Sequence, residues 1–328
     1  MSNQKNKKKP TRAVDSAMTQ ERAEKLVMRG LWLECALDLA DKYGLSDEPF
    51  YLTLSGADGK EIELLIKQGI IELTETGAIA EKSKNLVVAI ENNQDAQIQL
   101  ITKFPGLRVI REPVLNMLHG TKMTRFPDGA RERDCRARIV NLDLNEAWAP
   151  ELKDGEIVFP LMNAIAKLAQ LHADAPRKEW VLFLTVHGQI QWPENVAKNA
   201  VEFLAENFEQ VPTFAAACLA HLGSQLHESI SLKESVDFGE LPLVQQQKLL
   251  MAYVPKRISK LSREQGWKIT TLRNIFYGDH PRHAPMVSWI FKFSSDPRAH
   301  GNSHALYKDC VSGILNNTAR ILPDGRLV

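Results

Sequence analysis

Apolar runs that can form β-strands alternate with helical patterns along the first half of the chain. The clearest run covers residues 180–186, and residues 86–90 are apolar at every position. A strand without a polar face is typical of the interior of a parallel sheet, because helices cover both sides of such a sheet. Strands that alternate with helices also imply right-handed crossovers between parallel neighbours. We therefore expect an α/β fold, with further strands at residues 51–54, 107–110 and 137–142.

The pattern changes near the C-terminus. Residues 266–278 alternate between apolar and polar, and residues 285–293 are also β-like. The link between these two segments is too short for a crossover helix, so we expect an antiparallel hairpin at one edge of the sheet. Residues 194–265 have helical periodicity and are expected to form an insertion that covers a cleft.

The composition is that of a folded protein with no strong demand for a charged partner. The 328 residues are 44% hydrophobic and 25% charged, and the net charge of +1 gives no global attraction to nucleic acid or to membranes. No apolar run approaches the roughly 20 residues of a membrane-spanning helix, so no membrane partner is expected. Four cysteines lack the spacing of a zinc site or a CxxC motif and indicate free thiols in a reducing, cytoplasmic environment: Cys35, Cys135, Cys218 and Cys310.

The chain is expected to have four parts. Residues 1–17 form a basic tail that we expect to be disordered, either as a solubilising tail or as a weak phosphate-binding arm. Residues 18–48 are a helical segment, residues 49–300 are the main domain, and residues 301–328 are a C-terminal extension.

The first expected strand runs into a turn of small residues and then directly into a helical pattern. The turn consists of Ser55, Gly56, Ala57, Asp58 and Gly59. Strand, tight turn and helix is the arrangement of a nucleotide-binding turn, although the glycines of GxGxxG are not all present. A plain corner in the chain is the alternative interpretation.

Polar residues also stand where three later strands end. Glu91 follows the second strand, Glu112 and Asn116 follow the third, and Asn141 and Asp143 lie at the end of the fourth. Because the carboxyl ends of parallel strands share one edge of the sheet, these side chains are expected to meet at the edge where open α/β sheets bind ligands. A solvated acid at Glu91 and a helix cap at Asp143 are the alternatives.

Five parallel strands with helices, closed by an antiparallel hairpin, resemble the Rossmann-like fold of class I S-adenosylmethionine-dependent methyltransferases. The resemblance covers residues 50–295 and implies S-adenosylmethionine as the cofactor, with the backbone of the 55–59 turn passing close to its methionine end. The chain departs from the family at three positions. Many members have glycine where Ser55 and Ala57 stand, and an acid is usual where Thr53 stands. Asp58 is the acid of the turn that could replace it.

The resemblance also implies roles for the other strand ends. Glu91 would accept hydrogen bonds from the two ribose hydroxyls, because a carboxylate can accept two at once. Glu112 or Asn116 would meet the adenine amino group. Asn141 and Asp143 would orient the acceptor amino group, although the sequence here lacks the adjacent prolines and aromatic ring of the usual motif.

A cluster of basic residues favours nucleic acid as the methyl acceptor. It lies on one expected helix and consists of Lys256, Arg257, Lys260 and Arg263. Together with the basic tail it would provide a phosphate-binding face, and a merely solvated helix face is the alternative. Histidines near the C-terminus lack the spacing of a metal site, so no metal is expected: His280, His283, His300 and His304.

Three functions are consistent with these patterns. The first is S-adenosylmethionine-dependent methyl transfer to an amino group on nucleic acid. The second is a catalytically inactive relative that serves as an interaction subunit, with other protein subunits, in a nucleic-acid-processing or defence complex. The third is a nicotinamide-dependent enzyme, against which the missing GxGxxG motif and the terminal hairpin argue.

Overall fold

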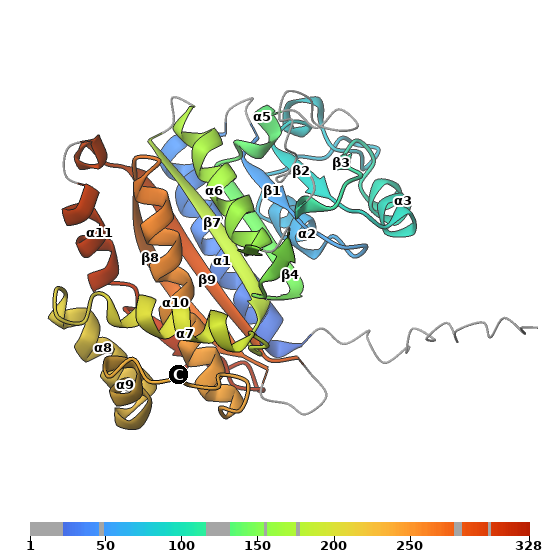
Figure 1. Cartoon of the computed structure of the whole chain (residues 1–328). Coiled ribbons are helices and arrows are strands. Elements are labelled where there is room, and N and C mark those ends of the chain that lie inside the picture. The colour runs from blue at the N-terminus through green and yellow to red at the C-terminus, as the bar shows by residue number, and fades with distance from the viewer. Residues whose placement is uncertain are drawn as a thin grey trace, which may run out of the picture.

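The computed structural model describes residues 22–45, 49–115, 132–153, 156–174, 178–278, 284–300 and 303–328. Within these residues the chain forms one eight-stranded sheet with helices around it (Figure 1). A separate two-stranded hairpin completes the strands. The expected α/β fold is therefore confirmed. The basic tail expected at residues 1–17 lies outside the described residues.

The large sheet is mostly parallel. Its strand order is β10-β8-β9-β7-β4-β1-β2-β3. Strand β9 runs antiparallel to both of its neighbours, β7 and β8, while all other neighbouring strands are parallel. The antiparallel pairing expected near the C-terminus is thus confirmed. Its expected position at an edge of the sheet is wrong, because β10 lies outside β8. The strands are β1 Tyr51–Thr53, β2 Val87–Ile90, β3 Arg108–Ile110, β4 Ile139–Ala147, β7 Glu179–His187, β8 Trp267–Tyr277, β9 Met286–Ser295 and β10 Thr318–Arg320, and the small hairpin pairs β5 Glu151–Lys153 with β6 Glu156–Val158.

Helices pack on both faces of the sheet. Alternate residues of β4 show this division, because Ile139 joins a core cluster with α1, α2 and α3, whereas Val140 joins another with α6 and α10. In Figure 1 the helices α6 and α10 lie in front of the sheet and α1 lies behind it. The helices are α1 Ala23–Tyr43, α2 Lys60–Lys67, α3 Gln94–Lys103, α5 Glu132–Cys135, α6 Pro160–Ala173, α7 Glu194–Ala205, α8 Pro212–Leu222, α9 Ser224–Ser231, α10 Leu243–Arg263 and α11 Ser303–Ser312. None of them, in the part of the chain described, is long and apolar enough to cross a membrane.

Helix α1 lies along the sheet and runs opposite to the parallel strands. Its buried residues recur every three or four positions, as on the core-facing side of an amphipathic helix, and Trp32 stacks on Phe183 of β7 with ring centroids 5.9 Å apart. Lys25 near its start contacts Asp143 of β4, and Lys42 near its end contacts Glu179 at the start of β7. The N-terminal end of α1 is therefore at the edge where the parallel strands end.

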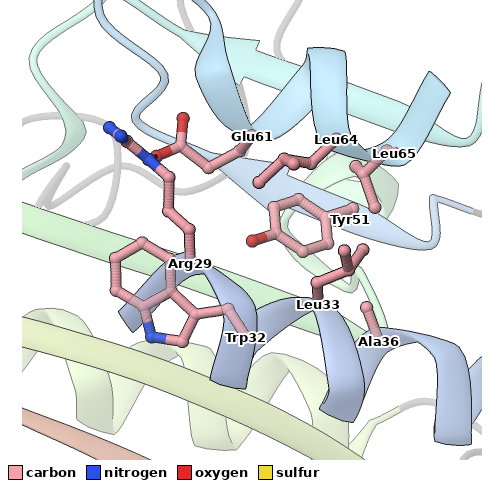
Figure 2. A pocket seen from close by; sticks show the side chains of 8 residues that line it. All are labelled: Arg29, Trp32, Leu33, Ala36, Tyr51, Glu61, Leu64 and Leu65. Carbon is pink, nitrogen blue, oxygen red and sulfur yellow. Dashed lines mark hydrogen bonds and ion pairs between the residues drawn. The ribbon is translucent and has the colours of Figure 1, made fainter. Parts of the chain in front are cut away.

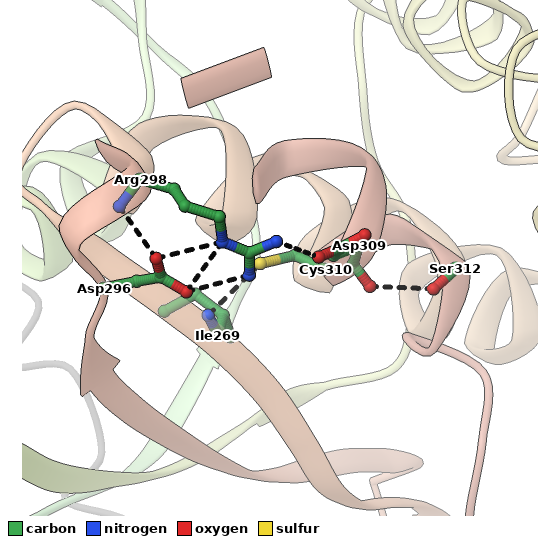
Figure 3. Close-up of polar contacts among 6 residues, drawn as sticks. All are labelled: Ile269, Asp296, Arg298, Asp309, Cys310 and Ser312. Carbon is green, nitrogen blue, oxygen red and sulfur yellow. Dashed lines mark hydrogen bonds and ion pairs between the residues drawn. The ribbon is translucent and has the colours of Figure 1, made fainter. Parts of the chain in front are cut away.

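The C-terminal residues are part of the same fold. Strand β10 pairs in parallel with β8 and so forms one edge of the sheet. The Arg298 guanidinium joins the end of β9 to α11, since it donates to Asp296 and, over 2.6 Å, to Asp309 (Figure 3). The expected extension at residues 301–328 thus completes the sheet.

The basic cluster expected on one helix does not form an open basic face. Lys256 of α10 is fully buried, and its Nζ donates to the backbone oxygens of Phe203 and Leu204. These carbonyls belong to the last turn of α7, where the helix itself provides no donor. The other three side chains also have partners within the protein. Arg257 lies over the Phe203 ring, Lys260 pairs with Glu206, and Arg263 lies over the Tyr307 ring.

The buried lysine makes a testable contribution to the pH dependence of stability. Burial lowers the pKa of Lys256 from 10.5 to about 7. Between these values the unfolded chain binds a proton that the folded chain does not, so the free energy of unfolding should rise with pH, by at most about 1.4 kcal/mol per pH unit. Urea unfolding at pH 7, 8 and 9 should show this rise in the wild type and a flatter profile in Lys256→Met. Equal slopes in the two proteins would contradict the assignment.

Candidate functional site

A cavity of about 450 Å³ lies at the carboxyl ends of strands β1 to β4. From β1 the chain moves outward to β2 and β3 on one side and then returns to β4 and β7 on the other. Open α/β sheets bind their ligands at this reversal of strand order, and the volume is within the range of about 300–1,000 Å³ for small-molecule sites. The cavity, here called the cleft, is lined by Leu54, Gly56, Ile90, Glu91, Asn92, Glu112, Pro113, Val114, Leu115, Asp143 and Leu144.

Strand register explains why two acids come to the cleft from different strands. Thr53 of β1 pairs with Ala89 of β2 on one side and with Asn141 of β4 on the other. Two residues further along each strand, Glu91 and Asp143 therefore continue the same row and point to the same side of the sheet. Their backbone positions are separated by two strand spacings, about 10 Å.

Glu91 is held in place at the end of β2. Its Oε1 accepts a hydrogen bond from the backbone N–H of Asn93 over 2.8 Å. Asn93 in turn is the N-cap of α3, because its Oδ1 accepts from the N–H groups of Asp95 and Ala96. The Oε2 of Glu91 has no partner among the described residues, and the side chain is half-buried. Glu91 therefore presents a fixed carboxylate with spare acceptor capacity.

The turn at residues 55–59 is divided between the cleft and the neighbouring helix. Gly56 lines the cleft, and a Cβ there would meet no atom within 4 Å. At Gly59, by contrast, a Cβ would lie 2.5 Å from Cε2 of Phe104. The Asp58 backbone oxygen accepts from Lys103 of α3 over 2.7 Å. Of the five turn residues proposed from sequence to bind the cofactor, Gly56 lines the cleft, while Ser55, Ala57, Asp58 and Gly59 do not.

Asn141 is not at the cleft. It is 1% exposed, and its Nδ2 donates to the hydroxyl of Tyr51 over 3.1 Å. Burial raises the pKa of the Tyr51 phenol well above its ordinary value, so the phenol remains protonated. The expected placement of Asn141 beside an acceptor was based on a strand ending at residue 142. Because β4 continues to Ala147, Asn141 lies within the sheet.

Asp143 does line the cleft, but it is already paired. Its Oδ2 lies 2.6 Å from Nζ of Lys25, with the two side chains 11% and 19% exposed. Its Oδ1 is shielded from solvent and has no hydrogen-bond partner among the described residues. Lys25 could not be identified from the sequence, because nothing in an isolated helix shows which of its charges will face a strand end.

A second ion pair joins α1 to the body of the protein four residues further along the helix. Arg29 donates to Oε1 of Glu61 over 2.9 Å, above the buried Tyr51 and Trp32 (Figure 2). The pocket at this place holds only about 10 Å³, which is the space of a single water molecule at most. This second pair is therefore structural, in contrast to the pair at the cleft.

The other candidates are placed as follows. Glu112 lines the cleft beside Pro113, whereas its alternative Asn116 lies outside the described residues, as do His280 and His283. Among the residues that the structure describes, no group of histidine, cysteine and acidic side chains could hold a metal ion.

Fold and site together define an α/β protein with a cleft of small-molecule size at the reversal of its strand order. A family model matches residues 130–321, and the chain belongs to this family, which is described as PP_RS20740-like. No curated protein matches the chain. The matched range contains β4 with Asp143 and everything up to β10, whereas Gly56, Glu91 and Glu112 precede it.

The two glycines of the turn predict different costs of substitution. Both have a left-handed backbone, with φ of +57° at Gly56 and +56° at Gly59, so alanine adds a similar strain of about 1–2 kcal/mol at either position. At Gly59 the new methyl group also meets the Phe104 ring. Gly59→Ala should therefore be less stable than Gly56→Ala by about 1–3 kcal/mol in urea unfolding. Equal losses would show that the turn adjusts freely.

Proposed function

We propose that the protein binds S-adenosylmethionine in the cleft and transfers its methyl group to an amino group of an acceptor. The observation that carries this proposal is the meeting of Glu91, Glu112 and Gly56, from three successive strand ends, in one cleft of suitable volume. The acids come from the second and third strand, where the methyltransferase resemblance assigns the ribose and adenine contacts.

The topology supports the same proposal. The order β3-β2-β1-β4-β7 is that of the first five strands of a doubly wound dinucleotide-binding sheet. The antiparallel β9 beside β7 then provides the hairpin that distinguishes the methyltransferase fold from a sheet that is parallel to its end. We therefore assign a Rossmann-like fold of the methyltransferase type.

The cleft suits an adenosine. Leu54, Ile90, Val114 and Leu144 provide apolar surface for the base. Glu91 can accept from the ribose hydroxyls while it keeps the bond from Asn93, because each carboxylate oxygen has two lone pairs. Acids at the cleft also favour a cationic sulfonium over its neutral thioether product, which helps the product to leave.

The reaction needs little chemical assistance from the protein. The lone pair of the acceptor nitrogen attacks the methyl carbon, the carbon–sulfur bond breaks, and S-adenosylhomocysteine leaves while the new amine loses a proton. The main requirement is in-line positioning of nitrogen, methyl and sulfur. Asp143 remains the proposed acceptor-orienting group on sequence grounds, whereas the burial of Asn141 removes it from that role.

The alternative is a protein that keeps the fold and has lost the reaction. Two observations favour it: the uncharged Thr53 stands where an acid is usual, and Asn141 is bonded to Tyr51 within the sheet. Such a protein would act as an interaction subunit. Nucleic acid as the acceptor rests on the N-terminal lysines alone, because the four charges of the basic cluster on α10 are used within the protein.

Calorimetric titration of the full chain tests the proposal. S-adenosylmethionine and S-adenosylhomocysteine should both bind, and a nicotinamide dinucleotide should not. Binding without transfer to single-stranded or double-stranded nucleic acid is what the alternative predicts. No binding of S-adenosylmethionine at millimolar concentration would overturn the cofactor assignment.

Glu91 provides the sharpest single-residue prediction. Glu91→Ala should weaken S-adenosylhomocysteine binding by about 1.5–3 kcal/mol, the range for hydrogen bonds to a charged group. Asn93→Ala is the matched control, because it removes the cap of α3 and costs about 1 kcal/mol of stability while leaving the carboxylate in place. Equal affinity in the wild type and in Glu91→Ala would assign Glu91 to the surface.

Gly59→Ala is expected to lose more stability than Gly56→Ala, but Gly56→Ala is expected to lose more affinity for the cofactor. The methyl group of Gly56→Ala lies at the cleft, so this variant should bind S-adenosylhomocysteine less well than the wild type. The methyl group of Gly59→Ala faces Phe104, so the folded variant should bind normally. A larger affinity loss in Gly59→Ala would place the cofactor elsewhere.

A further inference from the structure

The ion pair between Lys25 and Asp143 stands at the far end of the cleft from Glu91. Asp143 lines the cleft. Lys25, at the start of α1, lies behind this wall and contacts the Asp143 carboxylate from there. Both side chains are largely withdrawn from water. A pair in this position loses much of its Coulombic gain to desolvation, so stability alone gives a weak reason for its presence at a ligand site.

The pair has unused hydrogen-bonding capacity. Lys25 Nζ carries three hydrogens and Asp143 Oδ2 takes one of them. Asp143 Oδ1 has no hydrogen-bond partner among the described residues. Buried polar groups without partners are uncommon and call for an explanation. A ligand that carries both a cation and an anion would satisfy them.

We propose that Lys25 and Asp143 bind the amino-acid end of the cofactor, Lys25 its carboxylate and Asp143 its ammonium group. This inference rests on the proposed function, because it assumes adenosine at the Glu91 end. The row from Glu91 to Asp143 spans about 10 Å, which suits a nucleoside with an extended amino-acid arm. The terminal torsion of an aspartate is soft, so a small rotation turns Oδ1 towards the cleft that the side chain lines.

The absence of a charge at the end of β1 is explained by this arrangement. Thr53 at the end of β1 is fully buried and uncharged, and Asp58, the acid of the turn that follows, does not line the cleft. Asp143 provides the carboxylate for the ammonium group instead from the next strand of the sheet, and α1 adds the cation. Asp143 is then a cofactor-binding residue, and this role replaces the acceptor-orienting role that the sequence alone gave it.

Calorimetry with three ligands that carry two, one and no charged groups tests the assignment. S-adenosylhomocysteine has both charges, decarboxylated S-adenosylhomocysteine has only the amine, and 5′-methylthioadenosine has neither. Lys25→Met should weaken binding of S-adenosylhomocysteine alone, roughly 10- to 100-fold. Asp143→Asn should weaken binding of both amine-bearing ligands by a similar factor. Neither variant should change the affinity for 5′-methylthioadenosine, which also reports that the variant is folded.

Arg29→Met is the matched control. Arg29 lies on the same helix and forms an ion pair of similar burial with Glu61, away from the cleft, so its loss should leave all three affinities unchanged. Equal weakening of all three ligands in Lys25→Met would show a structural role and overturn the inference. An unchanged S-adenosylhomocysteine affinity in Asp143→Asn, with reduced turnover, would return Asp143 to the acceptor. If the wild type binds none of the three ligands, the proposed function itself fails.

Discussion

A strand of only three residues determines where the groups of the cleft lie. Strand β1 is buried throughout and pairs in parallel on both sides, with β2 and with β4. The hydrogen bond between the side chains of Asn141 and Tyr51 adds a direct contact between β1 and β4. Because Thr53, the last residue of β1, is level with Ala89 of β2 and Asn141 of β4, the first residues beyond β1 must turn at the reversal of strand order, between Glu91 and Asp143. The positions of Glu91 and Asp143 are thus consequences of register more than of any contact between them.

Helix α1 forms ion pairs near both of its ends, and the pairs differ in their exposure to solvent. At the far end of the sheet, Lys42 is 55% exposed where it meets Glu179, and such a surface pair contributes little. At the carboxyl edge, Lys25 and Arg29 are largely buried in pairs with Asp143 and Glu61. Breaking a buried pair leaves an uncompensated charge and is costly. The helix is therefore held most firmly at the carboxyl edge of the sheet, where the proposed ligand-binding role needs a fixed cation.

Much of this architecture follows from the sequence because it depends on local patterns. Apolar runs without a polar face indicated the central strands, and the short link indicated the antiparallel pairing of β8 with β9. Glu91, Glu112 and Asp143 could be brought together because parallel strands end at one edge. Asn141 could not be placed, because the end of β4 depends on pairing with β7 and not on residue type. Lys256 was taken for a surface residue, since a charged side chain becomes a buried cap only through the tertiary approach of α7.

The residues that line the cleft lie partly inside and partly outside the range that matches the family. Residues 130–321 include β4 and Asp143, whereas the groups proposed for the nucleoside, such as Glu91, come from the preceding segment and Lys25 comes from α1. A ligand that spans the cleft would therefore contact three segments that are distant in sequence. Met28, Trp32 and Ala36 pack α1 on the sheet through apolar contacts that need no ligand. The proposed binding site is consequently formed before the ligand arrives, and binding energy need not be used to bring α1 into place.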